Sequence, residues 1–457
     1  MKKKYQTFVS VCLAFIVVLT CAAGTVVATP AINLIDLKIE DLEKFAQMPS
    51  DYLASSSSES LISDSNQNEL AKSAILTFFN PWSRLKAAEQ PLMDSWGMTF
   101  FKNPRWGANL QRINDDQIKG LYDEADMGNF PSMNNPAIII CDSDSRNLPT
   151  EEPVFANPDA AGEGFPFDYM QKSRLRSGTP VLVRHESKNG EWLLVESPHF
   201  PGWVRRHNVA FASSSFISEY DTGNYAAITK DGVTLRDENG NFICTANVGS
   251  LFPIAEIRKD GTFVLNVPTR SSTGEAELAL AILSNGAEQY PIKYNAANIA
   301  TLADSLMYTK YGWAGLYGYR DCSQFLMELY MPFGISFPRK SNMQQDVFPK
   351  IDVSHLSAEE KIETVRKYST PFCTLLGFKG HVGIYVGTVD EEPLMLHCAW
   401  GVRLNDGNGL TGRLIMGKAV VTTLRPGKEV ANVEVNALLD KLTTIEFLPG
   451  ASQANLQ

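Results

Sequence analysis

The chain has 457 residues, with 41 Lys and Arg against 51 Asp and Glu, so its formal net charge is −10. This length indicates several domains, and a hydrophobic fraction of 44% beside 20% charged residues supplies packed cores and excludes wholesale disorder. The acidic balance argues against nucleic-acid binding, which depends on clustered positive charge. Beyond the N-terminus the sequence holds no further apolar run of about 20 residues, which excludes a polytopic membrane protein.

The N-terminus has the pattern of an export signal. Lysines at 2–4 precede an apolar stretch over about 8–23, and a small-residue pattern ending at Ala28 offers a cleavage site. An uncleaved anchor helix and a lipid-modified Cys21 are the alternatives. We therefore expect residues 1–28 to be a signal peptide and the protein to work outside the cytoplasm, in the periplasm or cell envelope or as a secreted protein.

Cysteine usage beyond the signal does not indicate a disulfide framework. The odd number of cysteines leaves at least one thiol unpaired, and an exported protein that keeps a thiol can use it. The spacings contain no paired CxxC, and the six His complete no zinc pattern, so we expect no metal. The remaining cysteines are Cys141, Cys244, Cys322, Cys373 and Cys398.

Residues 29–150 form a predicted N-terminal segment that is mostly helical. Its clearest helix spans 68–79, where apolar residues mark one side. A Ser-rich run over 55–65 precedes this helix and is typical of a loop.

Short strands and tight turns follow from about residue 151. Segments 180–185 and 191–197 flank Asn189-Gly190, a hairpin signal because Asn-Gly tolerates positive φ at both turn positions. A second set of strands turns at Asn239-Gly240. The spacing predicts two consecutive small β-barrels, over 151–216 and 217–288.

Helices return in the last predicted domain, residues 289–457. Apolar residues at helical spacing predict a helix over 295–308, and Ser357 with Glu360 forms a capping box that opens another. Two strands follow, over 381–387 and 394–400, so this unit belongs to the α+β class.

Cys322 stands at the start of a predicted helix that runs to about Met331, and Asp321 is a suitable N-cap. The positive end of the helix dipole stabilises a thiolate, which is the nucleophilic form, over a thiol. A nucleophilic Cys also needs a proton acceptor within reach, most often His. A lone Cys at a helix start is more often a small buried hydrophobic residue, so the position alone does not decide between packing and catalysis.

Two His stand on the two predicted strands. His381 shares one face of the first strand with Gly383, and His397 lies on the second strand. If residue 383 pairs with residue 397, both imidazoles point to the same side and His397 can orient and polarise His381. A one-residue slip would place them on opposite faces. A single His on a strand is usually structural, but a Cys and two His together in an exported chain favour catalysis.

Four motifs in a fixed order resemble the NlpC/p60 cysteine peptidases, in particular the γ-D-glutamyl-L-diamino acid endopeptidases with two bacterial SH3-like domains. The resemblance covers about 290–420, and Ala314 departs from it because the family usually has Gly there. The motifs are Tyr311-Gly312-Trp313-Ala314-Gly315, Asp321-Cys322-Ser323, Phe337-Pro338-Arg339-Lys340-Ser341-Asn342-Met343-Gln344 and His381-Val382-Gly383-Ile384-Tyr385-Val386-Gly387. The SH3-like pair is supported by Phe167-Asp168-Tyr169-Met170-Gln171, Gly178-Thr179-Pro180 and Gly202-Trp203-Val204.

This resemblance implies a papain-like α+β catalytic domain with Cys322 as nucleophile, His381 as general base and His397 as the third, orienting member. It further implies that the hydroxyl of Tyr311 helps the Cys322 N–H to hold the oxyanion. Carboxylate and hydroxyl groups suit a buried ammonium group, here the amine of an N-terminal L-Ala. The implied substrate contacts are Asp321 and Ser323 at that amine, Tyr169 closing that end, and Trp313, Arg339 and Ser341 lining the pocket.

The sequence therefore predicts a multi-domain protein: an N-terminal mostly helical segment, two small SH3-like β-barrels and a C-terminal papain-like α+β catalytic domain. The expected function is hydrolysis of the γ-D-glutamyl–L-diamino acid bond in peptidoglycan stem peptides with a free N-terminal L-Ala. The reaction would proceed through a thioacyl-enzyme without a cofactor. Peptidoglycan-derived peptides are the expected partners, and nucleic acid and metal ions are not.

Three alternatives stay open at this point. An enzyme of the same chemistry can cut intact peptidoglycan, with the SH3-like barrels as wall anchors, and would not require a free amine. A non-catalytic wall-binding protein with a vestigial triad is a second alternative, which the intact Cys and His residues argue against. An acyltransferase that uses the same thioester is a third, in which amines compete with water.

Overall fold

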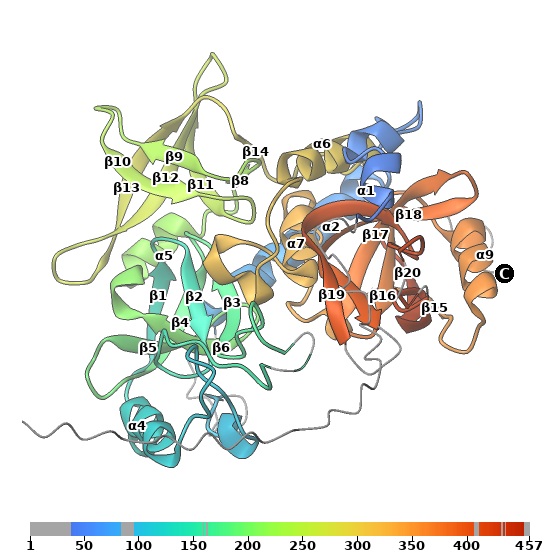
Figure 1. Cartoon of the computed structure of the whole chain (residues 1–457). Coiled ribbons are helices and arrows are strands. Elements are labelled where there is room, and N and C mark those ends of the chain that lie inside the picture. Colours follow the sequence, from blue (N-terminus) through green and yellow to red (C-terminus); the bar gives the residue numbers. More distant parts are fainter. Residues whose placement is uncertain are drawn as a thin grey trace, which may run out of the picture. The chain divides into compact units, whose positions relative to one another are not determined.

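The computed structural model describes residues 38–83, 96–158, 160, 163–405, 411–430, 433–434 and 436–451 (Figure 1). The predicted export signal at 1–28 lies outside the described residues. Within these ranges no helix combines the length and apolarity needed to cross a bilayer. The described residues from Lys38 onward belong to one compact unit.

The N-terminal segment is mostly helical, as the sequence predicts. Helix α2 (Asp64–Phe78) begins after Ser63, whose side chain accepts a hydrogen bond from the Asn66 N–H at 3.3 Å. The helix predicted over 68–79 therefore starts one turn earlier, because the end of the Ser-rich run supplies its cap. The other helices of this segment are α1 (Asp41–Lys44), η1 (Pro49–Tyr52), α3 (Asn80–Ser83), η3 (Phe100–Lys102), α4 (Asp115–Ala125) and η4 (Met127–Asn129).

The first β unit is a seven-stranded antiparallel sheet with the order β3-β2-β6-β5-β4-β1-β7. The predicted hairpin is confirmed, since β4 and β5 pair on either side of Asn189-Gly190. Strands β1 and β2 precede residue 151, because the buried run Ala137–Ile139 pairs with both β4 and β7. The strands are β1 (Asn135–Ile139), β2 (Ser143–Arg146), β3 (Gln171–Leu175), β4 (Pro180–Glu186), β5 (Trp192–Glu196), β6 (Pro201–Arg205) and β7 (Val209–Phe211), with η5 (Arg206–Asn208) before β7.

The second β unit follows helix α5 (Ser214–Tyr220) and consists of a five-stranded sheet, β13-β12-β11-β8-β14, and a two-stranded sheet, β10-β9. Its own apolar core includes Leu235, Phe252 and Leu265. The predicted turn at Asn239-Gly240 joins β9 to β10. The strands are β8 (Tyr225–Ile228), β9 (Val233–Arg236), β10 (Phe242–Ala246), β11 (Leu251–Ile257), β12 (Phe263–Arg270), β13 (Ala276–Leu283) and β14 (Ala287–Gln289).

The C-terminal domain has the predicted α+β architecture, built on the antiparallel sheet β15-β20-β16-β17-β18-β19. Its helices are α6 (Ala296–Leu306), η6 (Trp313–Gly318), α7 (Cys322–Tyr330), η7 (Met331–Phe333), α8 (Ser341–Gln344), α9 (Ala358–Tyr368) and η8 (Leu439–Lys441). Its strands are β15 (Lys350–Asp352), β16 (Thr374–Phe378), β17 (His381–Val389), β18 (Glu392–Asn405), β19 (Thr411–Thr423) and β20 (Leu442–Phe447).

Helices α7 and α9 cover opposite faces of this sheet (Figure 1). Alternate residues of β17 explain the arrangement, because successive side chains of a strand point to opposite faces. Val382 and Ile384 share an apolar core with Leu329 of α7, whereas Tyr385 packs in a second core with Val365 of α9. The face pattern of β17 predicted from the sequence is thereby confirmed.

A buried carboxylate, Glu328 of α7, connects the C-terminal domain to both β units. It accepts hydrogen bonds from Nε and Nη2 of Arg176, each at 2.8 Å, and from Nε of Arg320 at 2.6 Å. Arg176 also binds Asp142 at 2.6 Å, and Arg320 binds Asp231 at 2.5 Å. The two arginines and Glu328 are at most 4% exposed, and each has an opposite charge in contact.

The N-terminal segment covers the edge of the C-terminal domain's sheet at β19. The Gln47 side chain pairs with both backbone groups of Val421, at 2.9 and 3.0 Å. Asp41 of α1 accepts hydrogen bonds from the N–H and the hydroxyl of Thr423, both at 2.8 Å. These contacts satisfy an edge strand that would otherwise present unpaired backbone groups.

Candidate active site

Cys322 is the first residue of α7, and its position follows from the cap before it. The Asp321 side chain accepts the N–H of Gln324 at 2.9 Å, as an N-cap does, so the sequence-predicted helix start is confirmed. The thiol is buried, at 8% exposure, and it receives a hydrogen bond from the backbone of Val382 on β17. Burial, followed by the neighbouring Asp321 charge, raises the pKa of Cys322 to about 12.

The two imidazoles meet because β17 and β18 pair in the register that the sequence predicts. Ile384 lies opposite Leu396, which places residue 383 opposite residue 397. Nε2 of His381 lies 2.7 Å from Nδ1 of His397. Gly383 permits this approach, since a Cβ there would come within 3.1 Å of the His397 Cβ.

Thr422 on β19 fixes the direction of the hydrogen bonds in this chain. Its hydroxyl donates to the carbonyl of Thr423 at 2.8 Å and lies 3.0 Å from Nε2 of His397. Because a hydroxyl has a single proton, Thr422 accepts from Nε2–H of His397, whose Nδ1 then carries a lone pair. His381 therefore donates its Nε2–H to His397, and its Nδ1 is left as the proton acceptor of the site.

Burial keeps both imidazoles neutral near pH 7. It lowers the pKa of His381 to about 4, with the Asp321 charge partly opposing this and the Lys441 charge adding to it. It lowers the pKa of His397 well below its ordinary value, and the neighbouring His381 adds to this shift. The thiol and both imidazoles that line the cleft are therefore neutral at rest, so a Cys322 thiolate would require transfer of its proton to a base.

The site opens into a cleft of about 710 Å³ in which all ten residues singled out in the sequence are found. The candidate triad residues Cys322, His381 and His397 lie in it together with Tyr311. Among the residues that the structure describes, no group of three or more His, Cys, Asp or Glu is arranged to hold a metal ion. The remaining six are Tyr169, Trp313, Asp321, Ser323, Arg339 and Ser341.

The first β unit supplies one wall of this cleft through aromatic side chains. The rings of Phe167 and Tyr169 lie 5.2 and 5.8 Å from the ring of Trp313. Trp400 of β18 lies 5.9 Å from Tyr311. The first β unit therefore contributes directly to the wall of this cleft.

Tyr311 is placed to act as a hydrogen-bond donor beside the nucleophile. Burial raises its pKa well above the ordinary value, and the nearby Cys322 and Asp321 charges add to the shift. The phenol consequently stays protonated over the physiological range. The N–H of Cys322 lies in the first turn of α7, where backbone donors lack intrahelical acceptors. The two groups together suit a developing oxyanion.

Asp321 and Arg339 form a tight pair at the end of the cleft predicted to receive an amine. Arg339 donates to both carboxylate oxygens of Asp321, at 3.0 and 2.9 Å, and to Ser323 Oγ at 2.8 Å. The N–H groups of Ala314 and Gln324 also bind this carboxylate, at 3.0 and 2.9 Å. The acceptor sites of a carboxylate number about four, so the Asp321 side chain is saturated.

Ala314 adopts a backbone conformation that favours glycine, with φ +51°. It stands at the position where the sequence departs from the resembling family. The residue is buried, and its N–H is held by Asp321, so the turn imposes the left-handed conformation on a side chain that disfavours it.

Sequence reasoning missed several groups of the cleft. Phe167 belongs to the motif at residues 167–171, but no role in the cleft was predicted for it from the sequence. No local pattern marks Thr422, because its contact with His397 depends on which strands pair. The β18–β19 hairpin extends to Asn405, well past the strand end expected at residue 400, and carries cationic side chains into the cleft. These are Arg403 and Arg413, to which Lys441 of η8 is added.

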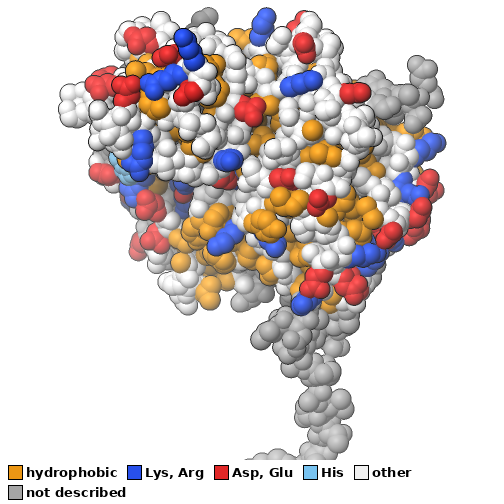
Figure 2. All heavy atoms as spheres, turned by 90° about the horizontal axis from the view of Figure 1, so that it is seen from above, with side chains coloured by type: hydrophobic (Ala, Val, Ile, Leu, Met, Phe, Trp, Pro, Cys, Tyr) orange, Lys and Arg blue, Asp and Glu red, His pale blue; other side chains and the backbone are white. Residues whose placement is uncertain are grey.

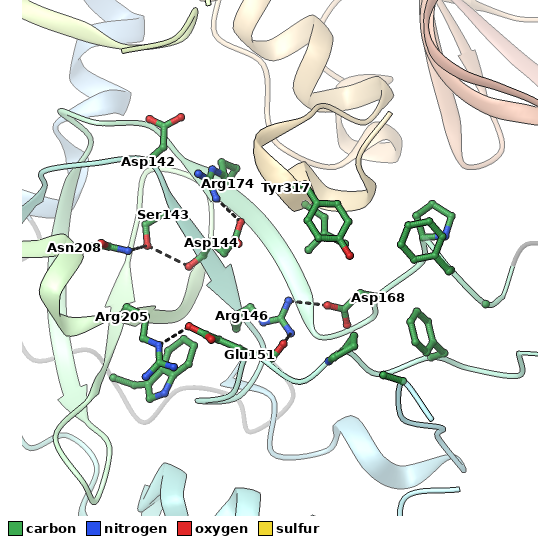
Figure 3. A pocket seen from close by; sticks show the side chains of 18 of the residues that line it. Asp142, Ser143, Asp144, Arg146, Glu151, Asp168, Arg174, Arg205, Asn208 and Tyr317 are labelled. Atoms are coloured by element: carbon green, nitrogen blue, oxygen red, sulfur yellow. Dashed lines mark hydrogen bonds and ion pairs between the residues drawn. The ribbon is translucent and has the colours of Figure 1, made fainter. Parts of the chain in front are cut away.

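A second concavity, of about 610 Å³, lies on the first β unit (Figure 3). Its charged side chains are paired with one another across short distances. Arg146 binds Asp168 at 2.7 Å, Arg174 binds Asp144 at 2.9 Å, and Arg205 binds Glu151 at 2.7 Å. None of the residues of the candidate triad lines this concavity.

Four protein-family models match separate parts of the chain, in the order that the sequence predicts. The N-terminal stabilising domain of the NLPC_P60 type matches residues 10–130, and the NlpC/P60 family model matches 308–408. An SH3 domain of SH3b1 type matches 153–205, and one of SH3b2 type matches 213–256.

A solved structure of an NlpC/P60 protein shares this fold. A structure described as a novel NlpC/P60 endopeptidase from Photobacterium damselae subsp. piscicida superposes with a TM-score of 0.79 and 22% identity, over 89% of this chain and 98% of that one. An NlpC/P60 family protein from Bacillus cereus gives a TM-score of 0.47 and 16% identity, over 69% of this chain and 99% of that one. The comparison with curated proteins found no match.

Proposed function

Since the chain belongs to the NlpC/P60 family, with two SH3b-type domains before the peptidase domain, we propose that it cleaves the γ-D-glutamyl–diamino acid bond of peptidoglycan stem peptides. The observation that carries this proposal is that Cys322, His381 and His397 line one cleft, with 2.7 Å between the two imidazoles. The predicted signal at residues 1–28 makes the protein an exported enzyme of the periplasm or cell envelope.

In the acylation step, His381 Nδ1 takes the proton of Cys322 while the sulfur attacks the γ-carbonyl of D-Glu. The S–C bond forms, and the carbonyl oxygen becomes an oxyanion facing the Tyr311 hydroxyl and the Cys322 N–H. The C–N bond then breaks, and the imidazolium returns its proton to the leaving amine. His397 and Thr422 hold the tautomer of His381 throughout, because Nε2–H stays bonded to His397.

In the deacylation step, water replaces the leaving peptide next to His381. The imidazole takes a proton from this water, whose oxygen attacks the thioester, and the proton then passes to the sulfur as the S–C bond breaks. The products are an L-Ala-D-Glu dipeptide and the released diamino acid peptide, and the thiol is restored. The two steps balance without a cofactor.

The saturated Asp321 carboxylate favours a second candidate, a hydrolase of intact peptidoglycan. An N-terminal ammonium group would need an acceptor at this end, where Arg339 already contributes a positive charge and occupies both oxygens. Tyr169 is likewise committed, since its hydroxyl donates to Glu163 at 3.1 Å. A neutral, acylated N-terminus meets no such conflict.

Two peptides separate the candidates: L-Ala-γ-D-Glu-diaminopimelate and its N-acetylated form, each incubated with the protein and with Cys322→Ala. Release of L-Ala-D-Glu from the free peptide alone, detected by mass spectrometry and lost in the variant, supports the free-amine enzyme. Equal cleavage of both supports the intact-wall hydrolase. Cleavage of neither overturns the hydrolase proposal and supports a wall-binding role, and transfer to an added amine in preference to water supports an acyltransferase.

A further inference from the structure

The second concavity, on the first β unit, is lined in part by apolar side chains that the fold leaves exposed. Phe165, Tyr317 and Leu110 line it with 65%, 63% and 62% of their surface exposed, and the two rings lie 6.4 Å apart. Exposed hydrophobic groups also occur elsewhere, and Figure 2 shows them among charged side chains of both signs on one face of the molecule. Here, however, they gather at a cavity of about 610 Å³, a volume typical of ligand pockets.

The charged side chains of the second concavity are paired, which disfavours an ionic ligand. Arg146, Arg174 and Arg205 each bind a carboxylate that also lines it. The pairs of Arg174 and Arg205 are nevertheless partly exposed, so these groups remain within reach of a ligand. An uncharged molecule that forms hydrogen bonds fits this arrangement.

Part of the hydrogen-bonding capacity of these pairs is unused. Among the described residues, the hydrogen bonds to the Asp144 side chain fall on Oδ1, from Gln171 at 2.8 Å and Arg174 at 2.9 Å. Arg205 forms its ion pair through Nε, and its guanidinium carbon lies 4.3 Å from the ring centre of Trp192. Oδ2 of Asp144 and the terminal nitrogens of Arg205 are therefore left to accept and donate to a ligand.

A pyranose sugar has the chemistry that this concavity requires. Its C–H groups form flat apolar faces that stack on aromatic rings, and each of its hydroxyls both donates and accepts a hydrogen bond. Figure 3 shows Arg205 and Tyr317 on opposite sides of the concavity, so polar and aromatic contacts can act on one ligand.

The second concavity and the Cys322 cleft share a wall. In the segment before β3, Phe165 lines the concavity and Phe167 lines the cleft. In η6, Tyr317 lines the concavity and Ala314 lines the cleft. The exposed ring of Phe165 also lies 6.5 Å from the ring of Trp400, which lines the cleft. A polymer can therefore occupy both sites at once.

The shared wall adjoins the Asp321 end of the cleft. The N–H of Ala314 in η6 binds the Asp321 carboxylate at 3.0 Å. On β3, Ser173 Oγ accepts from Nε of Arg339 at 3.0 Å, and the next residue, Arg174, lines the second concavity. In the proposed reaction this end receives L-Ala, whose nitrogen in intact peptidoglycan is acylated by the lactyl group of a sugar. The sugar would thus lie on the side of the second concavity.

We propose that the second concavity binds the glycan strand of peptidoglycan, at the sugar that carries the stem peptide, while that peptide lies in the Cys322 cleft. The inference rests on the proposed function and deepens it, because it makes the intact wall the substrate class. It also gives the first β unit a defined ligand and a defined place to bind it.

Two substrates with the same acylated N-terminus test the proposal: N-acetyl-L-Ala-γ-D-Glu-diaminopimelate, and the same peptide carried by N-acetylglucosaminyl-N-acetylmuramic acid. We expect kcat/KM to be about tenfold higher with the disaccharide, chiefly through a lower KM. Tyr317→Ala should remove most of this gain and leave kcat/KM for the sugar-free peptide unchanged.

Tyr308→Ala is the matched control and should keep the full gain. Tyr308 is 65% exposed and has a positive φ of 68°, against 60° at Tyr317, but it lines neither the second concavity nor the Cys322 cleft. Equal kcat/KM for both substrates in the wild type, a gain unchanged in Tyr317→Ala, or a gain lost equally in Tyr308→Ala overturns the inference.

A binding measurement separates this inference from the proposed function. Cys322→Ala is titrated by calorimetry with the same disaccharide carrying only L-Ala amide, which has no bond to cut. We expect binding that Tyr317→Ala, added to this variant, weakens about fivefold or more, and absence of binding overturns the inference. A wild type that cleaves only the free-amine peptide overturns the inference but not the proposed function. A wild type that cleaves no peptide overturns the proposed function, and the titration alone then decides whether the concavity binds sugar.

Discussion

Two groups of charged residues in this protein have opposite character. At the junction of the three domains, Arg176 and Arg320 are buried and each contacts carboxylates, with Glu328 between them. In the cleft, Arg403 and Arg413 face each other across a hairpin, and their positive charges repel. Paired charges stabilise the domain junction, whereas the two arginines of the hairpin bring like charges together.

Breaking the paired group should have the largest effect on stability. Glu328→Gln would leave two buried arginines with one carboxylate partner fewer, and removing one partner of a buried ion pair costs about 3–5 kcal/mol. We expect a fall of this order in the free energy of unfolding, measured by urea denaturation followed by tryptophan fluorescence. Glu238→Gln, which breaks an exposed pair with Arg258, is the control and should stay within about 1 kcal/mol. A loss below about 1 kcal/mol in Glu328→Gln would contradict the comparison.

The hydrogen-bond chain of the cleft gives a second, kinetic test. Thr422→Val removes the hydroxyl that accepts the Nε2–H of His397. The tautomers of His397 and His381 are then no longer fixed, so Nδ1 of His381 is not always free to act as the base. We expect kcat to fall about tenfold with KM unchanged, because a positioning partner of a catalytic imidazole contributes roughly this much. Thr422→Ser should restore most of the activity. Equal losses in both variants would indicate a packing role.

The pH profile tests whether burial sets the state of the base. His381 must be neutral to accept the thiol proton, and its pKa is lowered to about 4, so the acidic limb of kcat/KM should lie well below the ordinary His value. At pH 5.5 an imidazole with an ordinary pKa of about 6.5 would be about nine-tenths protonated, and activity would drop about tenfold. We expect nearly full activity at pH 5.5, measured as kcat/KM across a series of pH values at constant ionic strength. A limb centred near 6.5 would show that the imidazole is solvated.

The smallest predicted effect concerns the turn before the nucleophile. Ala314 has a positive φ, which costs an L-residue about 1–2 kcal/mol, whereas glycine loses about 0.5–1 kcal/mol through its freer unfolded state. Ala314→Gly should therefore raise the free energy of unfolding by up to about 1 kcal/mol without changing kcat, since the N–H to Asp321 is kept. A lower free energy of unfolding in Ala314→Gly would show that packing of the Ala314 methyl group stabilises the fold by more than the backbone strain destabilises it.

Much of the site follows from local sequence rules. Cys322 was identified from a helix start with an acidic cap, and the two imidazoles from the period of two along adjacent strands, and the structure places them together. The roles assigned to these residues stay predictions until activity is measured. Turn and helix patterns likewise predict a helical segment, two small β-barrels and an α+β domain, whereas the SH3-like character of the barrels was implied by the family resemblance.

The rest depends on tertiary pairing that local patterns do not encode. Strands β1 and β2 were hidden in a region without periodicity, and they are strands because β4, β7, β3 and β6 pair with them. The contact between Arg403 and Arg413 exists because of one particular hairpin register. The sequence could not show that the Asp321 carboxylate is saturated, because its ion pair with Arg339 forms only in the folded chain.

The proposed reaction passes through a thioester between Cys322 and the γ-carbonyl of D-Glu. The most direct measurement is to quench the protein with acid during turnover of a cleavable L-Ala-γ-D-Glu-diaminopimelate peptide and to map the adduct by tandem mass spectrometry. We predict an L-Ala-γ-D-glutamyl group on Cys322 that is absent from Cys322→Ala. Turnover with an acyl group on another residue, or with a product cut at a different bond, would contradict it.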